Sequence, residues 1–456
     1  MFLSEIFRDK EYLRKLTVVA FPLILQQVIT YSVNLLDTMM IGSFGDIPLA
    51  AVNLVNQFYL IYSVSIFGSV TGGSILNAQY WGKRDKKSIH HVMGIQFLFA
   101  MLIGSCFLVV SILFPHKILG FYSDDEAVAD AGKLYLQIIL PVFLLFPVGQ
   151  IFSGALRCTE NTGIPMLVSG GTLLLNAILN YLLIFGKFGL PALGLAGAAA
   201  ATVIARAVET TVFILITYCK KLPPAAPLSE MFHFNRPLVL MVIRKGIPVI
   251  VNEMIWGLGV NAYTAVYAGI STASIAAFSA VSPVDNIAQS LFMGIGDGCA
   301  VMVGNLLGAG KIETAKNYAK KTIRLSLCAA LLVGSLLVVL HQPIISLYAL
   351  SDTAAQLAGT LLVVVGFTLW LRTSNYTIII GTLRPGGQSL YCLLIETIVM
   401  WLLGIPLAGF MAERLHLPVY LVYLGTVTEE ASKLVVFFKR YKSGIWAVNL
   451  IEGTDA

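Results

Sequence analysis

Residues 154–157 read Gly154-Ala155-Leu156-Arg157, and residues 381–384 in the second half of the chain read Gly381-Thr382-Leu383-Arg384. Earlier in each half the same kind of match occurs at one constant offset, which is a single position shorter. The matched positions are Pro22 with Pro248, Ala50-Ala51 with Ala276-Ala277, Gly68 and Gly72 with Gly294 and Gly298, Gly82 with Gly308, and Tyr122 with Tyr348. A match that keeps its register across half the chain predicts an internal duplication, with the two copies related as a parallel repeat.

The composition is that of a membrane protein. Apolar residues make up 57% of the chain and charged residues 12%, which excludes an ordinary soluble domain. A helix needs about 20 mostly apolar residues to cross a bilayer. On that basis the sequence predicts an all-α integral membrane protein with twelve transmembrane helices, six per repeat. They are expected at 16–41, 47–72, 92–115, 133–155, 165–187, 194–218, 244–269, 275–298, 322–341, 357–382, 389–412 and 418–438.

The basic residues give the orientation. If both termini are cytoplasmic, the inner segments hold most of the Lys and Arg, including the cluster at 83–87, the linker at 219–243 and Arg384. The outer loops then hold only Lys117, Lys133, Lys187 and Arg414. This positive-inside bias predicts a multi-pass protein of the cell membrane. We attribute the net charge of +6 to this topology and expect the lipid bilayer, not a nucleic acid, as the large partner.

The predicted organisation has four parts. An N-terminal six-helix lobe covers 1–218, a Pro-containing cytoplasmic linker 219–243, a C-terminal six-helix lobe 244–438, and a cytoplasmic tail 439–456. The six cysteines are scattered without CxxC spacing and are interpreted as small buried apolar residues. The sequence contains no Walker loop, HExxH or GxSxG motif, which argues against ATP-driven pumping and against an enzyme. We expect a monomer without a cofactor.

Ionisable groups inside the spans are the candidates for function, because such groups are costly in a membrane and usually face an internal cavity. Asp37 lies near the outer end of the first span. Asn176 and Asn180 lie one helical turn apart on the fifth span, and Thr202 lies at a similar depth on the sixth. One carboxylate, two amides and a hydroxyl form a hard-oxygen set suited to Na⁺, and the carboxylate could bind H⁺ instead. The alternatives are a helix-end Asp37 wetted from outside and an Asn pair that joins helices.

In the second lobe, three charged residues fall near the middle of the bilayer. Glu253 lies in span seven, Asp285 in span eight and Arg372 in span ten. Two acids and one arginine would leave one negative charge, which could serve a cationic substrate or a proton. We therefore predict a Glu253–Asp285–Arg372 network, with a static cluster that only fixes helix packing as the alternative.

Two further groups of charges have helical spacing. Arg206 and Glu209 are three residues apart on span six, and Glu429, Glu430 and Lys433 lie within one turn of each other on span twelve. We interpret both groups as internal ion pairs with a structural role.

Several segments, in order and across both repeats, carry a family resemblance. They are Phe21-Pro22, Leu36-Asp37-Thr38 with Ile41-Gly42, Ala78-Gln79-Tyr80-Trp81-Gly82, Gly154-Ala155-Leu156-Arg157 with Asn161-Thr162 and Pro165, Leu175-Asn176-Ala177-Ile178-Leu179-Asn180, Gly194 to Thr202, Gly246-Ile247-Pro248 with Glu253, and Gly304-Asn305-Leu306-Leu307-Gly308-Ala309-Gly310. Over essentially its whole length the chain resembles the multidrug and toxic compound extrusion (MATE) family. The resemblance implies two six-helix lobes with a V-shaped central cleft.

The resemblance also implies a function. It is the export of organic cations or amphipathic drugs by antiport with H⁺ or Na⁺. In that family the acidic position of span one couples to the cation, and Asp37 matches it, with Asn176, Asn180 and Thr202 as supporting residues. Some members carry an aspartate at the position of Asn180, so the ion preference of this chain stays open. Members with a second-lobe site also have an acid in span ten, where this chain has Arg372.

Two other classes of function are weighed against drug efflux. A flippase or exporter of a lipid-linked or polysaccharide precursor could share the repeat, but such proteins often have additional spans and a strongly cationic cleft. A receptor or channel would be expected to show a signalling domain or a ring of pore-lining residues. The sequence favours the efflux transporter over both.

Overall fold

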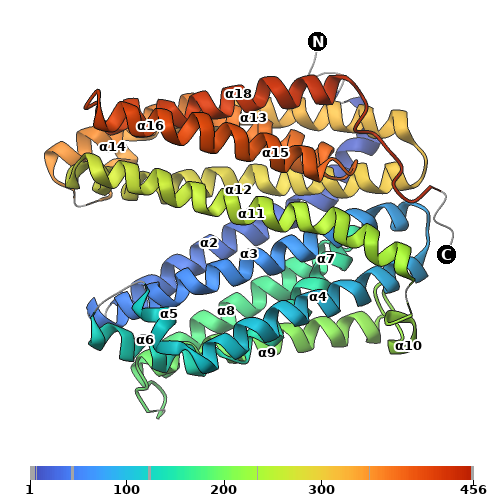
Figure 1. The fold of residues 1–456 in the computed structure, drawn as a ribbon, viewed down its shortest axis with the longest axis horizontal. Coiled ribbons are helices and arrows are strands. Elements are labelled where there is room, and N and C mark those ends of the chain that lie inside the picture. The colour runs from blue at the N-terminus through green and yellow to red at the C-terminus, as the bar shows by residue number, and fades with distance from the viewer. Residues whose placement is uncertain are drawn as a thin grey trace. The chain divides into compact units, whose positions relative to one another are not determined.

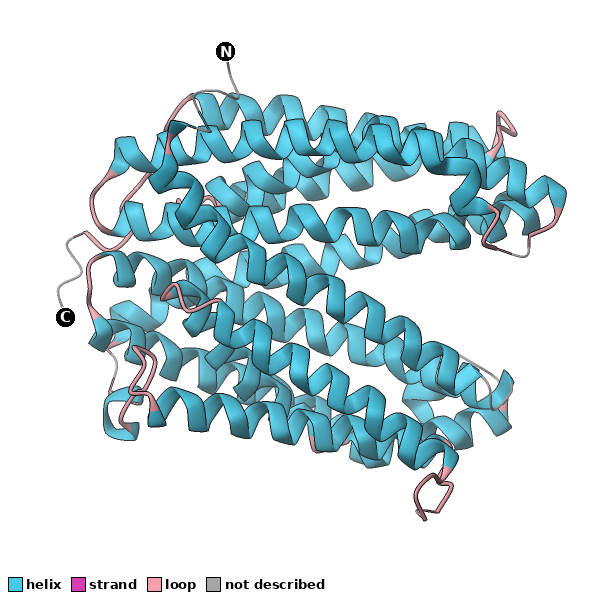
Figure 2. Ribbon diagram, turned by 180° about the vertical axis from the view of Figure 1, so that it is seen from behind, coloured by secondary structure: helices cyan, strands magenta, loops and turns pink. Residues whose placement is uncertain are grey.

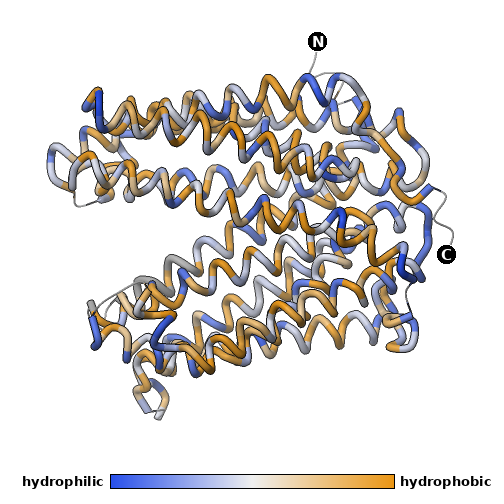
Figure 3. Tube along the Cα trace, viewed as in Figure 1, coloured by the Kyte–Doolittle hydropathy of each residue, from blue (hydrophilic) through white to orange (hydrophobic). Residues whose placement is uncertain are grey.

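The structure is a computed structural model that describes residues 6, 8–42, 46–121, 125–189, 191–233, 235–348 and 350–452, with the backbone alone described at 34, 35, 37–39, 42 and 46. Throughout that part the chain is helical and contains no strand, and loops join the helices (Figure 2). Apolar residues cover most of the helix lengths, while hydrophilic residues gather towards the helix ends (Figure 3). A helix suits such a sequence because it satisfies every backbone hydrogen bond within one segment.

Residue contacts group the chain into two units. Unit 1 comprises the residues up to Ile24 together with those from Val251 onwards, and unit 2 comprises Leu25–Ile250. The two breaks are separated by the same offset as Pro22 and Pro248 of the sequence repeat. Each break follows one of these two prolines, which lie inside helices, by two residues. The predicted lobe boundaries at 218 and 244 stay a prediction.

Unit 2 holds the first set of helices (Figure 1). Within it α8 packs along α9, α3 along α4, and α7 against both α4 and α9. The helices are α2 (Lys10–Gly42, which begins in unit 1), α3 (Asp46–Gly82), α4 (Lys86–Leu113), α5 (Pro115–Gly120), α6 (Glu126–Ile139), α7 (Val142–Cys158), α8 (Gly163–Phe185), α9 (Leu195–Cys219) and α10 (Leu228–Met231). Between α6 and α7 the chain bends by 51°, close to Pro141. Proline has no backbone N–H to donate, so a continuous helical hydrogen-bond ladder is interrupted there.

Unit 1 holds the second set, in which α12, α13 and α14 pack against one another and α18 lies along α14. Gly334 of α13 and Gly366 of α14 bring the two backbones together, since a Cβ on either residue would meet the carbonyl oxygen of the other. The elements are α11 (Arg236–Ile270, which begins in unit 2), α12 (Thr272–Gly308), α13 (Ile312–Ile345), α14 (Asp352–Ile378), the π-helical turn η1 (Ile379–Leu383), α15 (Ser389–Val399), the π-helical turn η2 (Met400–Gly404), α16 (Ile405–Glu413), α17 (Val419–Val422) and α18 (Leu424–Lys442).

Each of the twelve predicted spans overlaps a helix. In the described part of the chain nine helices are long and apolar enough to cross a membrane, and the bent pair α6–α7 makes a tenth span if counted together. The helices α11 and α18 are not among them because polar residues interrupt them, such as Asn252 and Glu253 in α11 and Glu429 and Glu430 in α18. The all-helical membrane fold is confirmed, and the count of twelve spans stays a prediction.

The predicted linker packs against the N-terminal end of α4. The ring of His90 on α4 hydrogen-bonds through Nε2 to the carbonyl oxygen of Pro223 at 2.9 Å, and Nδ1 lies 2.8 Å from a carboxylate oxygen of Glu230. Met231 of α10 is buried, and its carbonyl oxygen lies where a Cβ on Gly94 would be. The linker is therefore a packed part of unit 2.

Candidate functional site

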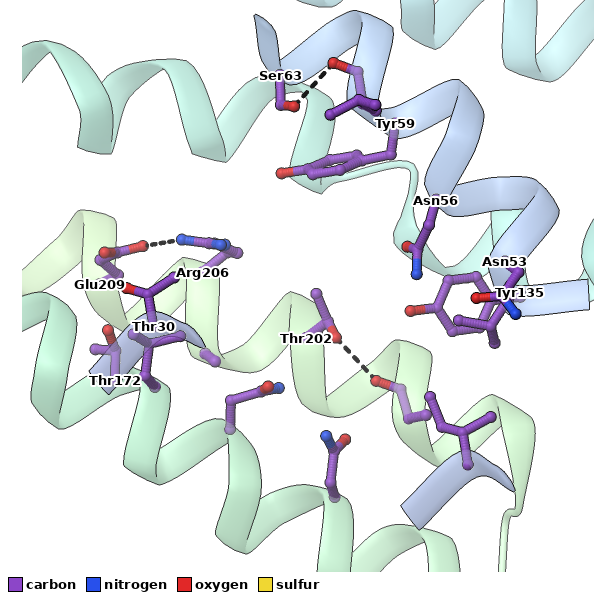
Figure 4. Close-up of a pocket in the computed structure, with 18 of the residues that line it drawn as sticks. Thr30, Asn53, Asn56, Tyr59, Ser63, Tyr135, Thr172, Thr202, Arg206 and Glu209 are labelled. Carbon is purple, nitrogen blue, oxygen red and sulfur yellow. Dashed lines mark hydrogen bonds and ion pairs between the residues drawn. The ribbon is translucent and has the colours of Figure 1, made fainter. Parts of the chain in front are cut away.

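A cavity of about 420 Å³ lies inside unit 2 (Figure 4). This volume falls within the range of about 300–1,000 Å³ that is common for small-molecule sites. The lining comes from α2, α3, α6, α8 and α9. Its polar and charged lining residues include Asn53, Asn56, Tyr59, Tyr135, Asn176, Asn180, Thr202, Arg206 and Glu209.

Three of the four residues predicted for cation coupling border this cavity. Asn176 and Asn180 reach it from one face of α8, and both are buried. Thr202 reaches it from α9, and its hydroxyl donates to the carbonyl oxygen of Ala198 at 3.0 Å. The fourth residue, Asp37, belongs to α2, and its side chain lies outside the described part of the structure. The common depth inferred from hydropathy thus corresponds to a common location for the three described residues.

The two charged residues among the described lining residues neutralise each other. Arg206 Nη1 donates to Glu209 Oε2 at 2.6 Å, within α9. The hydroxyl of Ser169 on α8 donates to the other oxygen of Glu209 at 2.8 Å. The guanidinium of Arg206 also lies 5.1 Å from the ring centroid of Phe146, which is a cation–π distance. The ion pair predicted from the sequence is therefore present, and it forms part of a cavity wall.

Sequence reasoning missed the opposite side of the cavity. Asn53, Asn56 and Tyr59 follow one another at three-residue steps along α3, and Tyr135 of α6 lies beside Asn53 (Figure 4). Residues three apart share a helix face, so the spacing of the two asparagines in an apolar helix indicates a polar face and could have been recognised from the sequence. The cavity therefore offers amide and hydroxyl groups from several helices together with aromatic rings. Such a surface can bind a small ion or a flat polar molecule by oxygen ligation and stacking.

In unit 1 the structure brings together two of the three residues predicted to form a network. The guanidinium of Arg372 on α14 donates two hydrogen bonds to the carboxylate of Asp285 on α12, at 2.7 and 2.8 Å. Paired hydrogen bonds of this kind are among the strongest that a carboxylate makes. Both side chains are largely buried. The charges of Arg372 and Asp285 therefore balance each other.

The third predicted member, Glu253, has a different partner. Its carboxylate accepts a hydrogen bond of 2.7 Å from Nη1 of Arg384, which follows η1. Nη2 of Arg384 lies 3.8 Å from Glu396 of α15, and Glu396 accepts a hydrogen bond of 2.7 Å from Asn252. The basic-residue pattern predicts Arg384 in an inner segment, whereas the structure buries its side chain to 5% exposure. The predicted three-membered network is therefore wrong in one member: Asp285 pairs with Arg372, whereas Glu253 pairs with Arg384.

A second ionic cluster is centred on α18. Lys433 contacts both Glu429 and Glu430, as the helical spacing predicted. Glu429 also accepts a hydrogen bond from the phenol of Tyr263 on α11. On the other side, Glu430 accepts a hydrogen bond of 2.7 Å from the amide of Asn375 on α14. These contacts join three helices of unit 1.

Comparison with known proteins assigns the chain to a family. The sequence profile of the MatE family matches residues 22–182 and 248–410, one match in each half. The probable multidrug resistance protein NorM of Thermotoga maritima is 23% identical over 443 residues, covering 96% of this chain and 93% of the relative. NorM of Bacillus cereus, also named a probable multidrug resistance protein, is 28% identical over 421 residues, covering 88% of each.

Solved structures have the same fold. The crystal structure of a mutant of the Vibrio cholerae MATE transporter VcmN superposes with a TM-score of 0.88, at 18% identity, over 96% of this chain and 98% of that one. The crystal structure of a MATE protein in complex with MaL6 gives a TM-score of 0.87, at 17% identity, over 95% and 96%. The profile covers most of the chain and matches both copies of its repeat. The chain therefore belongs to the MatE family of membrane transporters.

Proposed function

We propose that the protein is a secondary active multidrug efflux transporter that exports organic cations or amphipathic drugs by antiport with H⁺ or Na⁺. One observation carries the proposal: Asn176, Asn180 and Thr202, chosen from the sequence as ion ligands, border a single cavity in unit 2. Membership of the MatE family and relatives named as multidrug resistance proteins support it.

In the proposed mechanism, Asp37 supplies the charge that attracts the cation. Asn176 and Asn180 supply amide oxygens, and Thr202 supplies a hydroxyl oxygen at the same cavity. Oxygen ligands of this kind suit Na⁺, while a proton needs only the carboxylate. Tyr59 and Tyr135, which also border the cavity, offer ring faces to a flat cationic substrate.

Coupling requires that ion and drug favour different conformations. A ligand that binds two conformations equally well shifts neither population, however tightly it binds. One charge crossing ~100 mV releases about 2.3 kcal/mol, and a tenfold concentration ratio costs about 1.4 kcal/mol. The membrane potential can thus sustain a gradient of roughly fifty-fold for one neutral substrate per ion. Export of a monovalent cation against one ion moves no net charge, so the chemical gradient of the ion must then drive it.

The test is efflux of a fluorescent organic cation from liposomes that contain the purified protein. Proton and sodium gradients are imposed separately on the wild type, on Asp37→Asn and on Asn180→Ala. We expect one gradient to drive movement in the wild type and the Asp37→Asn variant to abolish it. Asp130→Asn is the matched control, because Asp130 is an exposed acid on α6 that does not border the cavity. Movement with neither ion, from folded protein, would reject drug antiport and direct the search to lipid-linked or polysaccharide precursors.

A further inference from the structure

The cluster on α18 contains more acid than base. Lys433 Nζ lies 3.2 Å from Oε1 of Glu430 and also contacts Glu429. The side chains of Lys433 and Glu429 are 3% and 2% exposed, so water does little to stabilise their charges. One ammonium against two carboxylates leaves one negative charge without compensation. A buried group in that position usually takes up a proton instead of keeping its charge.

The surrounding helices do not supply the missing positive charge. Arg372 of α14 is held by Asp285 of α12, and Arg384 is held by Glu253 and Glu396. Each nearby arginine therefore already has its own acid, and Glu396 adds a further carboxylate on the α15 side. The titratable and charged groups facing the cluster are Tyr263 and Tyr267 of α11, Asp285 of α12, Arg372 of α14, Glu396 of α15, Tyr423 beside α17, and Lys433 of α18.

An unused acceptor lies beside the cluster. Asn375 is 2% exposed, and its Nδ2 donates to Glu430 Oε2 at 2.7 Å and to the Glu430 carbonyl oxygen at 2.8 Å. Its Oδ1 is buried and has no hydrogen-bond partner among the residues that the structure describes. If the amide turns over, Oδ1 faces the carboxyl group, and only a protonated carboxyl can donate to it. Asn375 can therefore serve both forms of Glu430, as a donor to the carboxylate and as an acceptor from the acid.

The internal repeat matches residues of this cluster with the residues proposed to bind the cation in unit 2. At the offset that relates Pro22 to Pro248, Asp37 corresponds to Tyr263. At the offset that relates the two Gly-Ala/Thr-Leu-Arg segments, Thr202 corresponds to Glu429 and Arg206 to Lys433. In unit 1 the acid therefore stands on the last span of the repeat, and its hydrogen-bonding hydroxyl stands on the first. This correspondence rests on the proposed function of unit 2, whereas the charge imbalance and the unused acceptor do not.

We propose that Glu429 and Glu430 together bind one exchangeable proton, with Lys433 as a fixed counter-charge. The proton comes from water and returns to water, and no other bond changes. Glu430 is the more accessible acid, at 19% exposure against 2% for Glu429, so the proton enters and leaves there. With the proton bound, the cluster is neutral. The site belongs to unit 1 and shares no residue with the cavity of unit 2.

Infrared difference spectroscopy of the full-length protein in liposomes tests this proposal. We expect the wild type to show a deuterium-sensitive carboxylic-acid C=O band that disappears as the pH is raised. Glu429→Gln and Glu430→Gln should each remove this titration. Glu313→Gln is the matched control, because Glu313 is an exposed glutamate paired with a lysine, Lys316. Its band and midpoint should equal those of the wild type.

A second variant tests the same site without removing a charge. Asn375→Leu deletes the amide partner of both forms of Glu430. The charge-assisted hydrogen bond to the carboxylate is the stronger of the two, so its loss favours the protonated form and the midpoint should rise by about one pH unit. A merely structural asparagine would leave the midpoint unchanged. The proposal is overturned if the titration persists with an unaltered midpoint in both folded Gln variants, or if Asn375→Leu does not shift it. Asp37→Asn should keep the infrared titration even if it abolishes transport, which separates this proposal from the function proposed for unit 2.

Discussion

Arg206 in unit 2 and Lys433 in unit 1 occupy matching positions of the repeat, yet their surroundings differ. Arg206 pairs with one carboxylate at the wall of a cavity of about 420 Å³, and its side chain is 28% exposed. Lys433 pairs with two carboxylates in packed protein and is 3% exposed. A duplication thus preserved the helix and the positive charge while the space around the charge diverged. Open space suits the binding of a molecule, whereas close packing of an unequal number of charges suits the binding of a proton.

Removal of each cation gives the largest expected difference between the units. Lys433→Met leaves two buried carboxylates unpaired and should lower the free energy of unfolding by about 3–5 kcal/mol. Arg206→Met should cost clearly less, because it leaves one carboxylate without a cation instead of two, and that carboxylate belongs to a residue that borders the cavity. Thermal unfolding in detergent measures both losses. Adding Glu429→Gln to Lys433→Met should recover part of the stability, and equal losses in the two single variants would contradict the contrast.

Close packing around the α18 cluster can be probed at a neighbouring glycine. A Cβ on Gly404, at the end of η2, would meet the phenol oxygen of Tyr263 and a carboxylate oxygen of Glu429. Gly404→Ala should therefore cost about 1–3 kcal/mol of stability. Gly409→Ala in α16 is the control, because no described atom beyond its own stretch of helix lies within 4 Å of the added Cβ. It should be neutral or stabilise the helix by up to about 1 kcal/mol. Similar unfolding temperatures for the two variants would show that the cluster is loosely packed.

The smallest expected effects concern two threonines. Thr202→Val removes a hydroxyl that donates to a carbonyl oxygen of its own helix and borders a cavity, so stability should fall by about 0.5 kcal/mol or less. Thr377→Val in unit 1 removes a fully buried hydroxyl that is bonded to Ser326 at 3.0 Å. It should cost about 1–2 kcal/mol, because the serine loses its partner. Paired denaturation curves check the order, and a larger loss for Thr202→Val would reverse the assignment of open and packed regions.

The sequence predicted the position of a residue along its helix better than the neighbours that its side chain contacts. Hydropathy and repeat spacing gave the spans and the common level of Asn176, Asn180 and Thr202, since these follow from distance along a helix. It did not give the partner of Glu253, because pairing depends on how each helix is rotated about its axis and on which neighbours it packs against. Arg384 shows the limit. Two residues beyond a predicted span, it counts among the basic residues of the inner segments, whereas its side chain is buried and donates to Glu253.

The contact between α4 and the linker has a consequence for how the chain is made. His90 and Gly94 emerge from the ribosome well before Pro223, Glu230 and Met231, which cover them. During synthesis the N-terminal part of α4 therefore stays uncovered until six predicted spans have been made and the linker follows. Completion of unit 2 is in this way tied to translation of the linker. If the chain is divided for separate expression, it should accordingly be cut after residue 235 and not at residue 219, so that the first fragment includes the linker residues that pack on α4.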